Sequence, residues 1–310
     1  MIWLYIILIF VGIGIIGHFV TIFFIFYKFF GRVSLKRIDK ETRKNDYAEP
    51  YLEEIFKYRE EVEKIPSREI SLASFDNKLL TARLYERDSD KMIIMCHGFH
   101  ANPLSNFAYQ MKYFLEKNYN VLLINQRSHH GSEGIFSTYG QKEARDVCTW
   151  VDFANRIPKI KKIVLYGISM GATAICYASE NIFNNKVKCL IVESAFTSVE
   201  ALTKHILDSQ HVPAWLFKGG VKFLSRHLAG VTWEHNSTTR SLKKNQIPTI
   251  FVHGTKDTIA IQDFFEDNYN NCFSKKYKII VNDAPHALCT LKDKEAYLDQ
   301  INNILGELYE

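Results

Sequence analysis

A serine lies between two glycines in the segment GISMG, residues 167–171, directly after an apolar run typical of a buried strand. Residues that favour a helix follow it, so the serine is expected in a sharp turn between strand and helix. Gly167 and Gly171 would leave room for that turn, which lifts the Ser169 hydroxyl clear of the sheet at the positive end of the helix. The pattern alone is a weak signal, but the strand before it and the helix after it supply the required context. The segment predicts a nucleophile.

A serine hydroxyl needs a base, and a candidate follows the last predicted strand. His286, in the segment NDAPHALC, could take the serine proton and pass it to the leaving group. Asp257, in FVHGTKDTIA, could fix the tautomer of the histidine. Glu193 at another strand end is the alternative acid, whereas Asp283 is expected only to shape the loop of the histidine. The order serine, aspartate, histidine along the chain favours Asp257.

Two backbone N–H groups are expected to hold the oxyanion that forms when a serine attacks a carbonyl. One belongs to Met170, directly after the nucleophile, and the other to Phe99 in the segment CHGF, which follows the first long parallel strand. Gly98 would let the backbone approach the substrate. His97 and His100 are expected to order this loop rather than to react.

Strand-like and helix-like runs alternate from residue 67 onward, beginning with a hairpin around Asp76 and Asn77. Continuous apolar strands separated by helices predict a mostly parallel sheet covered on both faces, with ligands at the carboxyl ends of its strands. The candidate site residues follow such strand ends. The predicted helices are 105–118, 139–155, 170–182, 261–271 and 292–308.

Residues 196–246 interrupt this alternation. The segment is too long for a simple crossover, so we interpret it as a helical lid over the strand ends. Its apolar side chains could form a roof over an acyl chain, or they could only pack the lid onto the sheet. These side chains are Trp215, Leu216, Phe217, Phe223 and Leu224.

Residues 2–27 contain no Asp, Glu, Lys or Arg. A helix of this length reaches about 39 Å, at about 1.5 Å per residue, which is enough to cross a bilayer with some tilt. The run is too long for a signal peptide and lacks a basic start and a small-residue cleavage site, and its length also argues against a core helix. Residues 1–30 are therefore predicted to form a transmembrane anchor, in which His18 is either a tolerated polar residue or a functional one.

The flank after this span is basic and carries Lys28, Arg32, Lys36 and Arg37. The positive-inside rule then predicts a single-pass membrane protein whose C-terminal bulk is cytoplasmic. Residues 31–66 are expected to be a juxtamembrane linker with a helix that packs on the domain edge, lies near the membrane or is mostly solvated. Residues 67–310 are expected to form the α/β domain.

The composition narrows the classes of function. The net charge of +5 is modest and the Lys and Arg residues form no stripe, so no nucleic-acid partner is expected. The six cysteines show neither a CxxC nor a Cys/His zinc spacing, and we interpret them as reduced thiols, which favours a reducing compartment. The sequence leaves the oligomeric state open.

The chain resembles serine-type α/β-hydrolases over about residues 67–308. It is similar to the serine aminopeptidase-like and monoacylglycerol lipase-like branch, and in particular to membrane-anchored members of unassigned substrate. The resemblance is carried by HGF, GISMG, HGTKD and DAPHA in this order, and by NQRSHHGSEGIFSTYGQKEARDV. In the last segment Asn125 stands where the family usually has Asp, and Ser128 where Gly is usual, so the local turn is expected to differ.

The resemblance implies the α/β-hydrolase fold and cleavage of an ester, thioester or amide through an acyl-enzyme, without a metal or an organic cofactor. The leading hypothesis is a membrane-anchored esterase or lipase acting on acyl or lipid esters. A peptidase of the same fold would need clustered acidic residues in the lid, and Glu200, Asp208 and Glu234 show no clustering in the sequence. A membrane-tethered scaffold is the third hypothesis, but scaffolds derived from this fold typically lack the serine or the histidine.

Overall fold

The computed structural model describes residues 1–42, 48–182, 184–209, 214–234 and 236–309. Within these residues eight strands form one sheet in the order β1-β2-β4-β3-β5-β6-β7-β8. β2 runs antiparallel to both β1 and β4, and all other neighbouring strands are parallel. The strands are β1 Arg68–Ala73, β2 Leu79–Tyr85, β3 Lys91–Cys96, β4 Asn120–Ile124, β5 Lys162–Ile168, β6 Val187–Glu193, β7 Thr249–Gly254 and β8 Lys276–Val281.

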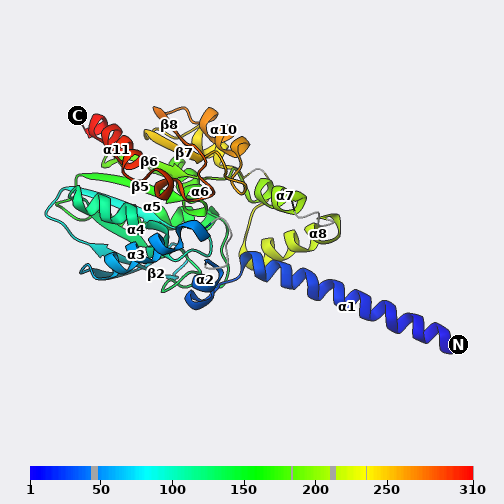
Figure 1. Ribbon diagram of the computed structural model, residues 1–310. Helices are drawn as coiled ribbons and strands as arrows, with labels where there is room; N and C mark the ends of the chain where they lie inside the picture. Colours follow the sequence, from blue (N-terminus) through cyan, green and yellow to red (C-terminus); the bar gives the residue numbers. More distant parts are fainter. Residues whose placement is uncertain (43–47, 183, 210–213, 235, 310) are drawn as a thin grey trace.

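Helices precede the sheet and cover both of its faces (Figure 1). The N-terminal helices are α1 Ile2–Phe30, α2 Leu35–Thr42, η1 Glu49–Tyr51 and α3 Leu52–Glu63. Those of the α/β domain are α4 Pro103–Glu116, α5 Gln141–Asn155, α6 Met170–Ala178, η2 Ser179–Asn181, α10 Gln262–Asn270 and α11 Cys289–Tyr309. The insertion between β6 and β7 contains α7 Val199–Ser209, α8 Ala214–Leu224, the π-helical turn η3 Ser225–Ala229 and α9 Thr238–Leu242.

Apolar side chains alternate between two core layers because successive residues of a strand face opposite sides of the sheet. Along β5, Ile163 and Leu165 join the layer beneath α5 and α6, whereas Val164 and Tyr166 join the layer beneath α3, α4 and α11. Every residue of β5 after Lys162 is buried. The parallel sheet covered on both faces is therefore confirmed, and so is the predicted first hairpin, whose turn residue Asn77 has a left-handed φ of 58°.

The start of α4 is fixed by its own sequence. The side chain of Asn102 accepts hydrogen bonds from the N–H groups of Leu104 and Ser105, and Pro103 follows at the first helical position. Both residue types stabilise helix starts, the first by capping free N–H groups and the second through its fixed φ. The loop between β3 and α4, which the site uses, is thereby held at its helical end.

Helix α1 projects from the body of the molecule (Figure 1). Only its C-terminal part is packed, with Ile22, Phe26 and Phe30 buried, whereas Phe10 is 70% exposed. This exposure excludes a core helix, and among the described residues α1 is the one helix long and apolar enough to cross a membrane. A helix near the N-terminus with these properties could also belong to a signal sequence.

The inserted helix α8 lies along the packed part of α1 (Figure 1). The ring of Phe217 stacks on His18 with centroids 5.6 Å apart, and a Cβ on Gly220 would lie 2.6 Å from the side chain of Ile22. Trp215 is 81% exposed. Residues 210–213 and 235 of the predicted lid, and residues 43–47 of the predicted linker, lie outside the described residues.

Candidate active site

Ser169 occupies the turn between the end of β5 and the start of α6. Its backbone has φ 54° and ψ −116°, a strained combination for a residue with a side chain. A Cβ on Gly171 would lie 1.9 Å from the carbonyl oxygen of Cys96. A Cβ on Gly167 would lie 2.5 Å from the backbone nitrogen of Ala172. The turn therefore requires glycine on both sides of the serine, for the reason that the GISMG pattern predicts.

His286 lies between the serine and the aspartate. Its Nε2 is 2.9 Å from Ser169 Oγ, and its Nδ1 is 2.8 Å from Oδ2 and 3.0 Å from Oδ1 of Asp257. When Nδ1 donates its proton to the carboxylate, Nε2 is the acceptor that can receive the serine proton. The structure thus brings together the three side chains that the sequence singles out, in the geometry of a nucleophile, a general base and an orienting acid.

The environment of Asp257 favours its ionised form. Burial by itself would raise the pKa of this carboxyl, but the charge of His286 and the hydrogen bond from it lower the pKa below its ordinary value. The carboxylate also accepts the N–H groups of Ile259 at 2.9 Å and of Ala260 at 2.8 Å. Its side chain has no exposed surface, so it is held rigidly against the imidazole.

The alternative acid, Glu193, is directed elsewhere. Its carboxylate accepts hydrogen bonds from the hydroxyl groups of Tyr166 at 2.9 Å and Tyr297 at 3.1 Å. Burial raises the pKa of Glu193, which therefore favours the neutral form. Asp283 is exposed in the loop before His286, with a left-handed φ of 57°. The geometry therefore favours Asp257 as the partner of the histidine.

The loop after β3 passes close to the nucleophile. A Cβ on Gly98 would lie 3.4 Å from the Cβ of Ser169. Among the described residues the N–H groups of Phe99 and Met170 have no hydrogen-bond acceptor, and Met170 is the first residue of α6, where helix N–H groups are unpaired. Asn106 of α4 fixes the loop, because its Oδ1 accepts the Gly98 N–H at 2.9 Å. No sequence pattern points to Asn106, since a single asparagine within a helix follows none.

Neutral histidines hold the same loop. His97 Nε2 accepts a backbone N–H at 3.0 Å, so its Nδ1 donates to the carbonyl oxygen of Gly98 at 2.7 Å. Burial lowers the pKa of His97, and it lowers that of His129 to about 3. His129 Nε2 accepts the N–H of His100, whose own Nε2 donates to the carbonyl oxygen of Gly31 at 2.9 Å. These contacts agree with an ordering role for His97 and His100.

The turn after β4 contains the two departures from the family pattern. Ser128 has a left-handed φ of 64°, a conformation that glycine adopts without strain. Its Oγ donates to the carbonyl oxygen of Phe136 at 2.6 Å, which helps to hold this backbone. Asn125 Nδ2 donates to Thr81 Oγ1 at 2.8 Å. Neither residue contacts the serine, the histidine or the aspartate described above.

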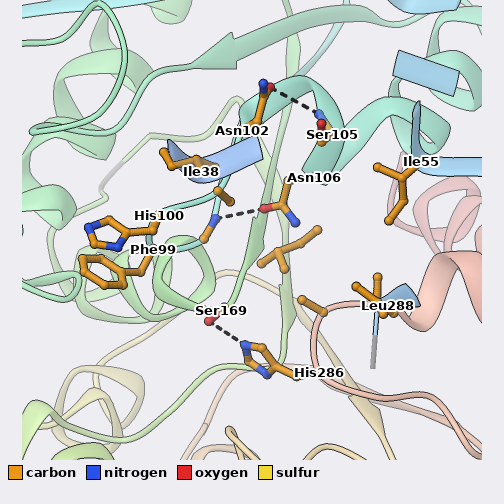
Figure 2. A pocket seen from close by; sticks show the side chains of 15 residues that line it. Ile38, Ile55, Phe99, His100, Asn102, Ser105, Asn106, Ser169, His286 and Leu288 are labelled. Carbon is orange, nitrogen blue, oxygen red and sulfur yellow. Dashed lines mark hydrogen bonds between the residues drawn. The ribbon is translucent and has the colours of Figure 1, made fainter. Parts of the chain in front are cut away.

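A cavity of about 240 Å³ lies beside Ser169 and His286 (Figure 2). It is lined by the loop and helix start at 98–106 and by the apolar side chains of Ile38, Ala48, Ile55 and Leu288. The described residues of the insertion do not line it, so they do not form the roof that was one of the two roles left open for the lid aromatics. Phe217 stacks instead on His18 of α1, and Leu224 packs against the apolar cluster that contains Phe26, whereas Trp215 and Phe223 are mostly exposed. In the described part of the chain, no group of three His, Cys, Asp or Glu residues is placed to hold a metal ion.

Known proteins share this architecture. The family model for the alpha/beta hydrolase fold matches residues 91–218. The YqkD protein of Bacillus subtilis (strain 168) is 25% identical over 224 residues, which are 71% of this chain and 73% of YqkD.

Solved structures agree with this match at the level of the fold. The esterase Pf2001 of Pyrococcus furiosus is 20% identical with a TM-score of 0.65, over 80% of this chain and 94% of that chain. Est1E of Butyrivibrio proteoclasticus, solved with ferulic acid bound, is 19% identical with a TM-score of 0.57, over 75% of this chain and 99% of that chain. The matched segment, the sheet order and the serine turn agree, and this chain has the α/β-hydrolase fold.

Proposed function

We propose that this protein is a membrane-anchored serine hydrolase that cleaves carboxylic esters through an acyl-enzyme intermediate. The observation that carries the proposal is the hydrogen-bonded chain from Ser169 through His286 to Asp257, with heavy-atom distances of 2.9 Å and 2.8 Å. Esterases among the solved structures of the same fold support the same class of reaction.

In the proposed reaction His286 Nε2 takes the Ser169 proton as Oγ attacks the ester carbonyl. The N–H groups of Phe99 and Met170 donate to the oxyanion that forms. As the tetrahedral intermediate collapses, His286 gives its proton to the departing alcohol, and an acyl group remains on the serine. The histidine then takes a proton from water, which attacks the acyl-enzyme and releases the acid. Asp257 stabilises the imidazolium at both stages.

Two features favour an ester over a peptide substrate. Two of the three acidic side chains of the insertion considered for a peptide amino terminus are ion-paired within the insertion: Glu200 lies 3.5 Å from Lys218, and Glu234 pairs with Lys222 and Arg226. The described residues of the insertion do not line the cavity beside the serine. The hydrogen bonds that join Ser169, His286 and Asp257 support an active hydrolase over a scaffold without activity.

The membrane anchor belongs to the same proposal. Helix α1 is 29 residues long, its exposed surface is apolar, and its basic C-terminal flank supports a cytoplasmic domain. All six cysteines are free thiols, which is consistent with a reducing compartment. The substrate would then be an acyl or lipid ester encountered at the inner membrane surface.

The test uses the full-length protein in detergent and p-nitrophenyl acetate. We expect a burst of p-nitrophenol equal to the enzyme concentration, and an acetyl group on the peptide that contains Ser169 after acid quenching and mass spectrometry. Ser169→Ala should show neither. Hydrolysis that persists in Ser169→Ala at the wild-type rate would overturn the proposal.

A further inference from the structure

We propose that helices α2 and α3, which lie between α1 and the α/β domain in the sequence, contribute to the substrate site. In this proposal Ile38 of α2 and Ile55 of α3, together with Leu288, form an apolar wall that admits only a short acyl or alkyl chain of the ester. The inference deepens the proposed function and rests on it. It gives α2 and α3 a role beyond the juxtamembrane linker and helix that the sequence predicts.

The wall is buried and faces the reacting groups. Ile38 is 1% exposed, Ile55 is 5% exposed and Leu288 is 9% exposed, and all three line the cavity beside Ser169 and His286. Figure 2 shows Ile38 on one side of this cavity and Ile55 and Leu288 on the other. An apolar chain attached to the ester would meet these side chains as it leaves the serine.

Polar contacts fix α2 against the pocket. Asp39, next to Ile38, accepts hydrogen bonds from Arg59 of α3 at 3.0 Å and from Asn102 Nδ2 at 3.3 Å. The same guanidinium donates to Ser105 Oγ at 3.5 Å. Asn102 and Ser105 also line the cavity. Asp39 therefore joins α2 and α3 to the start of α4, and the wall cannot move without breaking these bonds.

The chain is also fixed where it leaves α1. The guanidinium of Arg32 donates to the carbonyl oxygen of Ser132 at 2.8 Å and to that of Gly134 at 3.3 Å. The carbonyl oxygen of Gly31 accepts the His100 Nε2–H, and His100 lines the cavity. Gly31 and Arg32 are thus bound both to the loop beside the serine and to the turn after β4, so the start of this segment belongs to the folded site.

The size of the cavity sets the length of the chain. A volume of about 240 Å³ is smaller than the range of about 300–1,000 Å³ that is usual for sites of drug-sized ligands. Replacing either isoleucine by alanine would enlarge the cavity by the volume of several methyl and methylene groups. A longer ester chain would then fit where the wild-type wall excludes it.

The experiment compares full-length wild type with Ile38→Ala and Ile55→Ala in detergent. One series of esters keeps p-nitrophenol and varies the acyl group from acetate through butyrate and octanoate to dodecanoate. A second series keeps acetate and varies the alkyl alcohol. Val62→Ala is the matched control, because Val62 is buried on the same helix as Ile55 but does not line the cavity.

Wild type should prefer short chains. Each alanine variant should raise the ratio of kcat/KM for the eight-carbon chain to kcat/KM for the four-carbon chain by at least about tenfold in one of the two series. The series that responds shows whether the wall meets the acyl or the alkyl group. Val62→Ala should keep the wild-type ratio. Because Ile38 and Ile55 lie on different helices, either variant can carry the test if the other fails to fold.

The proposed wall would be contradicted if both variants kept the wild-type ratio of kcat/KM between long and short chains in both series. It would also be contradicted if wild type hydrolysed dodecanoate and butyrate esters equally fast. A wild type that hydrolyses no ester, and that a fluorophosphonate probe does not label, would instead overturn the proposed function and the wall with it. Labelling therefore separates the two failures.

Discussion

The role of His286 depends on which of its nitrogen atoms carries the proton. Asp257 accepts from Nδ1 at 2.8 Å, and this contact leaves Nε2 free to accept the Ser169 proton at 2.9 Å. The acid is held by two backbone N–H groups as well as by the histidine. Its charge and its position are therefore both set before a substrate binds, which is the condition for efficient general-base catalysis.

Asp257→Asn is expected to lower kcat for p-nitrophenyl acetate by about four orders of magnitude. The amide NH2 would face Nδ1, so the imidazole would carry its proton on Nε2 and could not accept the serine proton. Asp283→Asn, in the exposed loop before His286, is the control and should keep nearly all activity. Comparable rates for the two variants would contradict the assigned acid.

The lowered pKa of Asp257 also links stability to pH. The unfolded carboxyl has a pKa of about 3.9, and the folded one is lower. The ionised group therefore stabilises the folded state above about pH 4, and this contribution is lost as the pH falls through the folded pKa. The difference in melting temperature between wild type and Asp257→Asn should shrink below about pH 4. Thermal unfolding in detergent at several pH values measures it, and a difference that grows on acidification would count against an ionised Asp257.

At the scale of elements, the proposed reacting groups are positioned by strand ends and by the start of one helix. Ser169 follows the end of β5, Asp257 lies in the loop after β7, and His286 lies in the loop after β8. The loop after β3 has no such rigid support of its own. It depends on Asn106 of α4 and on the surrounding neutral histidines.

Asn106→Ala is expected to lower kcat for p-nitrophenyl acetate by about tenfold to a hundredfold, with a smaller change in KM, because the Gly98 N–H loses its acceptor and the adjacent oxyanion donor loses its position. Gln110→Ala, on the same helix and also buried, removes a hydrogen bond to Thr290 away from this loop. If both variants lost the same activity, general destabilisation and not loop position would explain the effect.

The sequence predicted much of this arrangement. The alternation of apolar strands and helices, the serine turn and the order serine, aspartate, histidine depend on local patterns, and these are visible in a single sequence. The choice of Asp257 over Glu193 rested on that order, and the structure explains it, since Glu193 is engaged by Tyr166 and Tyr297.

Contacts between distant segments could not be predicted in this way. Nothing local to Ile38 or Ile55 indicates that they meet the loop of Asn102 and line a cavity with Leu288. The apolar character of Phe217 was visible, but its partner was not, because an apolar helix packs on whichever apolar surface the fold brings near. That surface is α1.

At the scale of the whole molecule, the N-terminal helix and the α/β domain form one packed unit. Ile22, Phe26 and Phe30 join an apolar cluster that includes Met170 and Phe196. A helix that served only as a tether would not need to pack this close to the serine turn. In the proposed membrane protein, this packing would fix how the cavity is presented to the membrane.

Membrane orientation is testable on intact cells and on permeabilised cells. The basic flank of α1 favours a cytoplasmic domain, so an added protease should digest the domain only after permeabilisation. The full-length protein should also remain with the membrane fraction after alkaline carbonate extraction. Digestion from outside intact cells would contradict the orientation, and release by carbonate would contradict the span.

The most direct test of the account is labelling of the full-length protein with a fluorophosphonate probe, which reacts only with an activated serine. We predict that wild type is labelled, that Ser169→Ala is not, and that His286→Ala is labelled far more slowly although it folds. Labelling that persists in Ser169→Ala, or a folded wild type that the probe never labels, would contradict the claim that Ser169, His286 and Asp257 form a working catalytic site.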